Sequence, residues 1–180
     1  MRTKHVEVVE HDEGWHDQFR RLQQRLTQGL EEAGMGGALV GIEHVGSTAV
    51  CGLWAKPILD IDLVYRERSD LTGIARALAK LGYTDEGNLG IPGREAFAYD
   101  ELPGLMTHHL YACPQDSAEL KRHITFRDYL RSHPQAVKEY SQAKREAAQR
   151  FPDDIDNYIA YKSPVIEKLY RSCGLLGEGE

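Results

Sequence analysis

Residues 43–65 read EHVGSTAVCGLWAKPILDIDLVY and join a Gly-Ser turn to a strand that carries two acidic residues. Apolar and acidic residues alternate from Leu59 to Leu63, and successive side chains of a strand point to opposite faces of its sheet. We therefore expect Asp60 and Asp62 to share one face. Two neighbouring carboxylates repel each other unless a positive charge lies between them. A divalent cation with oxygen ligands, Mg²⁺ or Mn²⁺, is the simplest candidate.

The turn before this strand is suited to a phosphate group. Gly46 and Ser47 offer backbone N–H groups and a hydroxyl. Residues 48–55 are predicted to form a short helix, whose N-terminus would attract the same anion. Lys56 follows this helix and either reaches the phosphate or is solvated. Two interpretations of His44 stay open: a contact with phosphate or an acceptor group, and a hydrogen bond to the turn backbone.

Wider runs of the sequence resemble a known family. A Gly-Ser turn followed by a strand with Asp-x-Asp resembles the core motif of the DNA-polymerase-β-like nucleotidyltransferase superfamily. The runs HVGSTAV (44–50) and GLWAKPILDI (52–61) resemble the signature of the GrpB family within it. The runs HHLY, ELKRH and FRDYL in residues 108–130 resemble that family's second block, and the likeness extends over residues 7–172. Cys51 differs, because the family usually has proline there.

The resemblance implies a fold and a chemistry. The expected fold is α+β: a nucleotidyltransferase-like mixed β-sheet with helices on one face and a C-terminal helical segment. Asp60 and Asp62 would hold one or two Mg²⁺ ions that bridge a nucleoside triphosphate. Lys56 and Arg122 would neutralise the charge that develops on the transferred group. Lys162 is placed near the ligand cleft by the resemblance, although a structural role is an equal alternative.

The spacing of apolar residues predicts the other elements. Residues 13–33 have apolar side chains at helical spacing, and a helix over 70–81 should cover the sheet face to which Leu59, Ile61 and Leu63 point. Further strands are expected over 38–45, 83–85, 95–99 and 105–113, and further helices over 116–132, 134–150 and 154–172. Residues 86–94 are predicted to form a mobile glycine-rich loop, in which Arg94 either contacts the ligand or is solvated.

The strand over 105–113 carries two adjacent histidines that must point to opposite faces. His108 falls on the helix-covered face, and His109 falls on the face of Asp60 and Asp62. By the resemblance, a third acid usually occupies such a strand, but no Asp or Glu lies between Leu105 and Pro114. His109 is therefore a candidate metal ligand, proton acceptor or surface histidine.

Length, charge and cysteine content limit the classes of function. The 180 residues are expected to form one domain, with an α/β core over 1–115, a helical part over 116–172 and a flexible tail over 173–180. A net charge of −6 argues against general nucleic-acid binding. Three cysteines without a C-x-x-C pair fit reduced thiols in the cytosol, and we expect a cytoplasmic protein without a membrane span or signal peptide.

Three functions are compatible with this sequence. The leading one is metal-dependent transfer of a nucleotidyl group from an NTP to a small-molecule or protein acceptor. In it Asp60, Asp62 and His109 are catalytic and metal-binding, and the nucleotide contacts Gly46, Ser47, Lys56, Arg122 and Lys162. The second is a non-catalytic module for a nucleotide or a coenzyme-A-type ligand, since GrpB-like segments also resemble a domain appended to some dephospho-coenzyme-A kinases. The third is a Zn²⁺- or Mn²⁺-dependent phosphoester hydrolase, because mixed His and Asp ligands suit those metals.

Overall fold

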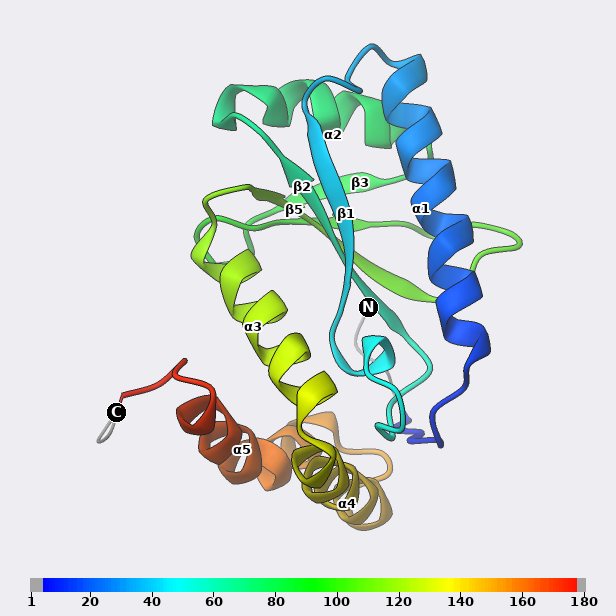
Figure 1. Cartoon of the computed structure of the whole chain (residues 1–180). Coiled ribbons are helices and arrows are strands. Elements are labelled where there is room, and N and C mark those ends of the chain that lie inside the picture. Colours follow the sequence, from blue (N-terminus) through cyan, green and yellow to red (C-terminus); the bar gives the residue numbers. More distant parts are fainter. Residues whose placement is uncertain (1–4, 178–180) are drawn as a thin grey trace.

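The computed structural model describes residues 5–177 and contains a five-stranded sheet with helices on both of its faces (Figure 1). The strand order is β1-β2-β5-β4-β3, in which β2 and β5 run parallel and the other neighbours antiparallel. The predicted α+β class and mixed sheet are confirmed. The strands are β1 (Leu39–Val45), β2 (Leu59–Tyr65), β3 (Thr84–Gly87), β4 (Glu95–Ala98) and β5 (His108–Pro114). The helices are α1 (Gly14–Glu32), α2 (Leu71–Lys80), α3 (Ala118–Ser132), α4 (Pro134–Arg150) and α5 (Ile155–Ser172).

One face of the sheet is covered by α1 and α2, and this position was predicted for the helix over 70–81. The apolar residues of β2 that alternate with the acids, Leu59, Ile61 and Leu63, are fully buried on this face. They belong to one core cluster with Leu22, Leu26 and Leu30 of α1 and with Ile74 and Leu78 of α2. Burial of apolar surface stabilises the folded chain, so the apolar side chains of β2 face this layer. The two acids, which alternate with them, therefore lie on the opposite face of β2.

The C-terminal helices lie on the other side and at one end of the sheet (Figure 1). Leu120 of α3 packs against Val64 of β2 and Cys113 of β5. Val50 and Leu53, in the connection before β2, pack against the helical segment in a cluster with Leu130, Ala136, Tyr140 and Leu169. The C-terminal segment is therefore anchored to the same connection that carries the Gly-Ser turn.

The connection between β1 and β2 differs from the predicted helix over 48–55. Only a single 3₁₀ turn, η1 (Ser47–Ala49), forms there. Val50 is already extended, with φ −116° and ψ 115°, and Gly52 has a φ of 76°, outside the helical region. Ala55 then pairs with Val9 in an isolated antiparallel bridge. Pairing and burial of this segment therefore outweigh its helix propensity.

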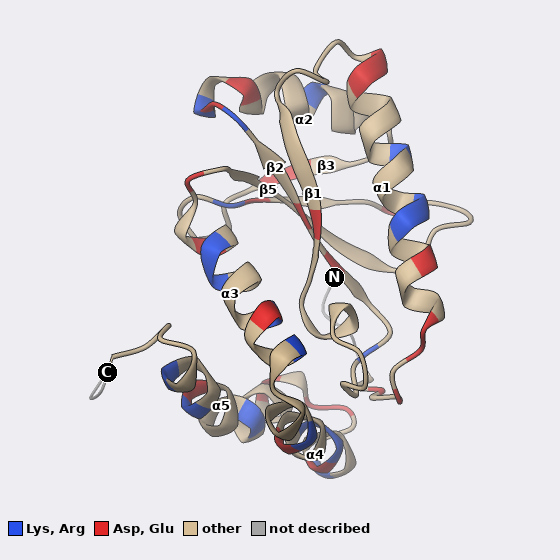
Figure 2. Cartoon of the chain, viewed as in Figure 1, with Lys and Arg blue, Asp and Glu red and all other residues tan. Residues whose placement is uncertain are grey.

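Charged residues are mixed over the helices. Figure 2 shows acidic and basic residues interspersed along α3, α4 and α5, and acidic residues in the middle of β1 and β2. Within residues 5–177, no helix combines the length and the apolar character that a membrane span requires. Of the tail predicted at 173–180, residues 178–180 lie outside the described part of the chain.

Candidate functional site

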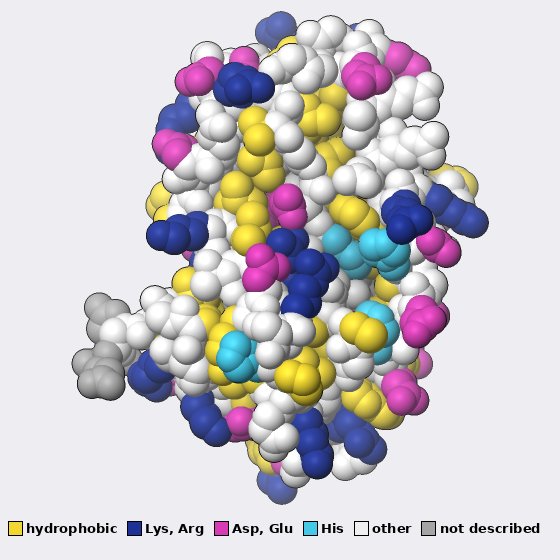
Figure 3. Space-filling model, in the orientation of Figure 1, with side chains coloured by type: hydrophobic (Ala, Val, Ile, Leu, Met, Phe, Trp, Pro, Cys, Tyr) yellow, Lys and Arg dark blue, Asp and Glu magenta, His cyan; other side chains and the backbone are white. Residues whose placement is uncertain are grey.

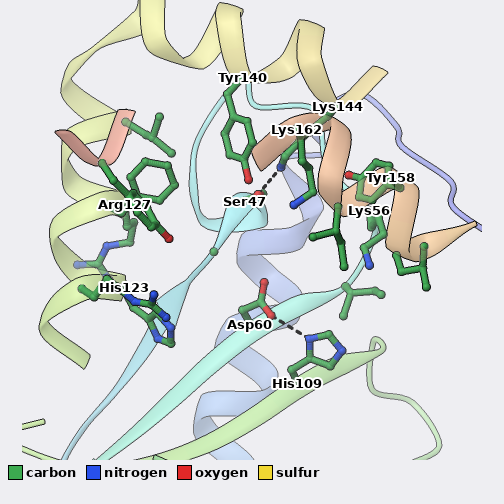
Figure 4. A pocket seen from close by; sticks show the side chains of 18 residues that line it. Ser47, Lys56, Asp60, His109, His123, Arg127, Tyr140, Lys144, Tyr158 and Lys162 are labelled. Atoms are coloured by element: carbon green, nitrogen blue, oxygen red, sulfur yellow. Dashed lines mark hydrogen bonds and ion pairs between the residues drawn. The ribbon is translucent and has the colours of Figure 1, made fainter. Parts of the chain in front are cut away.

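A cavity of about 430 Å³ lies between the Gly-Ser turn, the sheet and the C-terminal helices. The turn, β2 and β5 form one wall, and α3, α4 and α5 form the other (Figure 4). Of the eight residues predicted for the site, seven line this cavity: Gly46, Ser47, Lys56, Asp60, His109, Arg122 and Lys162. Asp62 does not line it.

Asp60 and His109 form a pair on the cavity wall. They are direct partners in the parallel register of β2 and β5, and His109 Nδ1 lies 3.0 Å from Asp60 Oδ1. Their side chains are 34% and 38% exposed, respectively. When Nδ1–H donates to the carboxylate, the other ring nitrogen, Nε2, carries the lone pair. The pair can therefore accept a proton from a group bound in the cavity.

Asp62 shares the face of Asp60 but is not open to the cavity. Its side chain is fully buried, and its Oδ2 accepts a hydrogen bond from His123 Nδ1 at 2.7 Å. Burial raises the pKa of Asp62, whereas His123 acts in the opposite direction. Asp62 Oδ1 is buried and has no hydrogen-bond partner among the described residues. The alternation of β2 could not predict this burial, because α3 comes from a distant part of the chain.

The Gly-Ser turn is pressed against Asp60. Gly46 has φ 69° and ψ −166°, a conformation essentially restricted to glycine. A Cβ atom at this position would lie 2.2 Å from Asp60 Oδ2. The first hydrogen bond of the turn runs from Ala49 N to Gly46 O, so the N–H groups of Ser47 and Thr48 precede its hydrogen-bonded part. Such free N–H groups are suited to bind an anion.

Lys144 is the main site residue that the sequence did not reveal. It lies in a charge-rich stretch of α4, but its side chain is only 4% exposed. Its Nζ donates a hydrogen bond to Ser47 Oγ and lies 4.3 Å from the centre of the Tyr140 ring. One signal was present: Lys144 is four residues after Tyr140 and three before Ala147, on the buried stripe of α4.

Three lysines converge on the Gly-Ser end of the cavity (Figure 4). Burial lowers the pKa of Lys56. Burial, and then the charge of Lys56, lowers the pKa of Lys162 to about 8. Burial, followed by the charge of Lys162, lowers the pKa of Lys144 well below its usual range. Within residues 5–177, none of the three forms an ion pair with a carboxylate. This concentration of cations is electrostatically unfavourable until an anion enters.

The rest of the cavity is largely apolar and aromatic, with charged residues at its α3 side. Arg122 donates a hydrogen bond to Glu119 Oε2 at 2.6 Å, so its charge is partly neutralised. Arg127 is held by Glu43 Oε2 at 2.7 Å. Figure 3 shows basic side chains gathered near the middle of one face, with acidic and histidine side chains beside them. The apolar and aromatic lining comes from Ile58, Phe126, Leu130, Ile155, Tyr158, Ile159 and Tyr170.

Three other residues considered from the sequence do not line the cavity. His44 is buried, and its Nε2 lies 2.9 Å from Thr48 Oγ1, which agrees with a hydrogen bond to the turn, although to a side chain and not to the backbone. His108 lies on the helix-covered face as predicted, with its Nε2 2.8 Å from the Tyr83 hydroxyl. Arg94 lies over the ring of Tyr111 at 4.1 Å.

A preformed cage of metal ligands is absent from residues 5–177, where no group of three or more His, Cys, Asp or Glu side chains is placed to hold an ion. A zinc site needs three or four such protein ligands. Mg²⁺ usually needs only one or two carboxylates, together with water and the phosphates of its ligand. Asp60 and the unpartnered oxygen of Asp62 match that smaller requirement.

Comparison with solved structures identifies the class of fold. The structure of Cid1 in complex with the UTP analogue UMPNPP aligns with a TM-score of 0.54 over 79% of this chain and 43% of that chain. At 10% identity this likeness concerns the fold alone. Over the aligned region the chain thus shares its fold with Cid1.

The chain belongs to the GrpB family, whose model, described as GrpB protein, matches residues 5–172. The crystal structure of GrpB from Enterococcus faecalis aligns with a TM-score of 0.76 and 31% identity, over 92% of this chain and 98% of that one. The UPF0157 protein YqkA of Bacillus subtilis (strain 168) is 33% identical over 162 residues, which span 90% of this chain and 45% of YqkA. The chain therefore spans less than half of that relative.

Proposed function

We propose that the cavity binds a nucleoside triphosphate and transfers its nucleotidyl group to a small-molecule or protein acceptor. The observation that carries this proposal is the convergence of the buried Lys144, the half-buried Lys56 and Lys162, and a Gly-Ser turn beside the Asp60–His109 pair. The lysines and the turn suit a polyphosphate. The Asp60–His109 pair suits an acceptor hydroxyl that must lose a proton.

The phosphate end of the ligand would lie at the Gly-Ser turn. Lys56 and Lys162 line this end, and no carboxylate among residues 5–177 forms an ion pair with either of them. Hydrogen bonds to charged groups contribute about 1.5–3 kcal/mol each, and a triphosphate has enough oxygens to engage both. The free N–H groups of Ser47 and Thr48 would complete the phosphate contacts. Binding would relieve the repulsion among the lysines, which favours polyanions over neutral ligands.

Asp60 and Asp62 would hold Mg²⁺ or Mn²⁺, while His109, whose Nδ1 is paired with Asp60, would serve as a base and not as a metal ligand. Asp60 faces the cavity, and Asp62 Oδ1 is a buried oxygen without a partner among the described residues. When bound, the ion would neutralise charge on the triphosphate and polarise its phosphorus–oxygen bonds. For the alternative of a Zn²⁺-dependent hydrolase, residues 5–177 contain no group of three or more candidate ligands placed to hold an ion.

His109 is placed to act as the general base. With Nδ1 held by Asp60, Nε2 would accept the proton of an acceptor hydroxyl as the hydroxyl oxygen attacks the α-phosphorus. Pyrophosphate would leave toward Lys56 and Lys162, whose ammonium groups neutralise its charge. Arg122, which is paired with Glu119, would support the transferred group from the α3 side. In this scheme His109 stands where a third acid is usual in the nucleotidyltransferase superfamily that the sequence resembles.

Binding can be tested by thermal denaturation with ATP, GTP, CTP and UTP, each with and without Mg²⁺. We expect Mg²⁺-dependent stabilisation by at least one of them, lost in Asp60→Asn and weakened at least about tenfold in affinity in Lys162→Met. Asp17→Asn, an exposed acid of α1, is the matched control and should behave as wild type. If Asp60→Asn and Asp62→Asn leave metal and nucleotide binding unchanged, the site assignment is wrong.

Transfer is tested separately from binding, by release of pyrophosphate in the presence of candidate acceptors. Release that depends on acceptor, Asp60 and His109 supports the transferase. Stabilisation by a nucleotide or a coenzyme-A-type ligand without release, over a broad panel of hydroxyl acceptors and protein extracts, supports the non-catalytic binding module.

A further inference from the structure

The Ser47–Lys144 contact is not required for binding a polyphosphate, for which Lys56 and Lys162 suffice. Lys144 reaches Ser47 from a position 97 residues away in the sequence, and its Nζ is in hydrogen-bond contact with Ser47 Oγ. The lysine is almost fully buried, and within residues 5–177 no carboxylate forms an ion pair with it. The hydroxyl group of Tyr140 points toward the same serine (Figure 4). A lysine held against a serine in this way is an arrangement that activates serine as a nucleophile.

We propose that Ser47 is a self-phosphorylation site, which takes the terminal phosphoryl group of a nucleoside triphosphate bound in the same cavity, with Lys144 as the base. This inference rests on the proposed binding of a triphosphate. Nucleotidyl transfer takes place at the α-phosphate, whereas this second reaction would take place at the terminal phosphate. The Gly-Ser turn lies at the lysine-rich end of the cavity, where the terminal phosphate would be held.

The step balances without another reactant. Ser47 Oγ forms a bond to the γ-phosphorus, and the bond between that phosphorus and the β–γ bridging oxygen breaks. The nucleoside diphosphate leaves with the electron pair of the broken bond, and the serine proton passes to Lys144 Nζ. Burial and the positive charge of Lys162 both lower the pKa of Lys144, which favours the neutral amine that accepts a proton from a serine hydroxyl.

The product would be stable where it forms. A phosphoserine carries about −1.5 to −2 charges at neutral pH, and at position 47 it would lie among Lys56, Lys144 and Lys162. These groups lack carboxylate partners among the described residues, so the phosphate would supply their counter-charge. It would also occupy the place of the terminal phosphate of the next triphosphate. Self-phosphorylation would therefore switch off nucleotide binding by the modified protein.

A simpler role for Lys144 is to hold phosphate without acting as a base, and one variant separates the two roles. Lys144→Arg keeps a positive charge for phosphate binding, but a guanidinium does not release its proton near neutral pH. With a base role, this variant should bind nucleotide and phosphorylate Ser47 about 100-fold or more slowly than wild type. With a binding role only, Ser47 should either stay unmodified in wild type or be modified equally fast in Lys144→Arg.

The experiment is intact-protein mass spectrometry of the full chain after incubation with each triphosphate and Mg²⁺, followed by peptide mapping. We expect a gain of one phosphoryl group on Ser47, at a rate independent of protein concentration, and none in Ser47→Ala. Ser69→Ala, which removes an exposed hydroxyl outside the cavity, should match wild type. The modified protein should lose its stabilisation by nucleotide.

Wild type that is stabilised by a triphosphate but stays unmodified at Ser47 overturns the self-phosphorylation and leaves the proposed binding intact. A phosphoryl group found only on other residues, or modification that is equally fast in Lys144→Arg, also overturns it. If no triphosphate stabilises the wild type, the proposed function fails first, and this inference fails with it.

Discussion

Replacing Lys162 with methionine is expected to stabilise the empty protein while weakening its binding of phosphates. Burial, and then the charge of Lys56, lowers the pKa of Lys162 from 10.5 to about 8. At about 1.36 kcal/mol per pKa unit, this lowering of the Lys162 pKa corresponds to roughly 3 kcal/mol. The folded chain is destabilised by roughly this amount, relative to the unfolded chain, when Lys162 is charged at neutral pH.

The sign of the pH dependence follows from the same values. The folded pKa lies below the unfolded one, so the unfolded chain binds more protons between about pH 8 and pH 10.5. The unfolding free energy of wild type therefore gains from this group as the pH rises through that interval. Methionine carries no proton, so its advantage is largest below pH 8 and shrinks above it. Loss of the cation beside the Tyr158 ring, at 5.3 Å, offsets about 0.5–1 kcal/mol, which leaves a net gain of about 2–3 kcal/mol.

The assay is urea denaturation at about pH 7 and about pH 9.5, analysed by linear extrapolation, with triphosphate affinity measured by calorimetry on the same samples. Lys138→Met, at an exposed position of α4, is the control and should change neither quantity. The reasoning is refuted if Lys162→Met is less stable than wild type at neutral pH, or if its gain is the same at both pH values.

Three further changes test separate parts of the site. Gly46→Ala should abolish nucleotide-dependent stabilisation, because the added Cβ would lie 2.2 Å from Asp60 Oδ2. Gly52→Ala is the control, since Gly52 has a similar positive φ but an added Cβ there meets no heavy atom within 4 Å. It should cost only roughly 1–2 kcal/mol of stability and keep nucleotide binding. His109→Gln should reduce pyrophosphate release about 100-fold or more with little change in nucleotide affinity, measured under saturating triphosphate. Burial lowers the pKa of His44 from 6.5 to about 4, so the stability that His44 contributes is complete above pH 6.5 and falls by up to roughly 3 kcal/mol as the pH drops to about 4. Acid denaturation of His44→Gln should therefore have a weaker pH dependence.

The fold could be predicted from sequence where local pattern and tertiary packing agree. The alternation in β2 identified the buried face correctly, because Leu59, Ile61 and Leu63 do meet α1 and α2. The placement of His108 and His109 on opposite faces follows from the same period of two. The register that pairs Asp60 with His109 could not be derived that way, because a parallel register depends on the crossover between the strands.

The misses all involve contacts between distant parts of the chain. The sequence predicts Asp62 as an exposed ligand, but in the structure His123 of α3 lies against it. Residues 48–55 contain a local helix breaker, Gly52, and pairing with Val9 and packing under the C-terminal helices add non-local reasons for their extended conformation. Lys144 reads as a solvated charge because charged residues surround it in sequence, and only the packing of α4 against the turn reveals its contact with Ser47.

The distance in sequence between Ser47 and Lys144 has a consequence for how the protein would acquire the proposed nucleotide binding. The two residues are 97 positions apart, and Lys162 comes later still, so the phosphate end of the cavity closes a long loop of chain. Closing such a loop is entropically costly and tends to occur late in folding. A molecule with a complete sheet but undocked α4 and α5 would hold the acids without the lysines. Nucleotide would then bind only after the whole described chain has folded. The bound nucleotide would in turn stabilise the docking of α4 and α5 against the sheet.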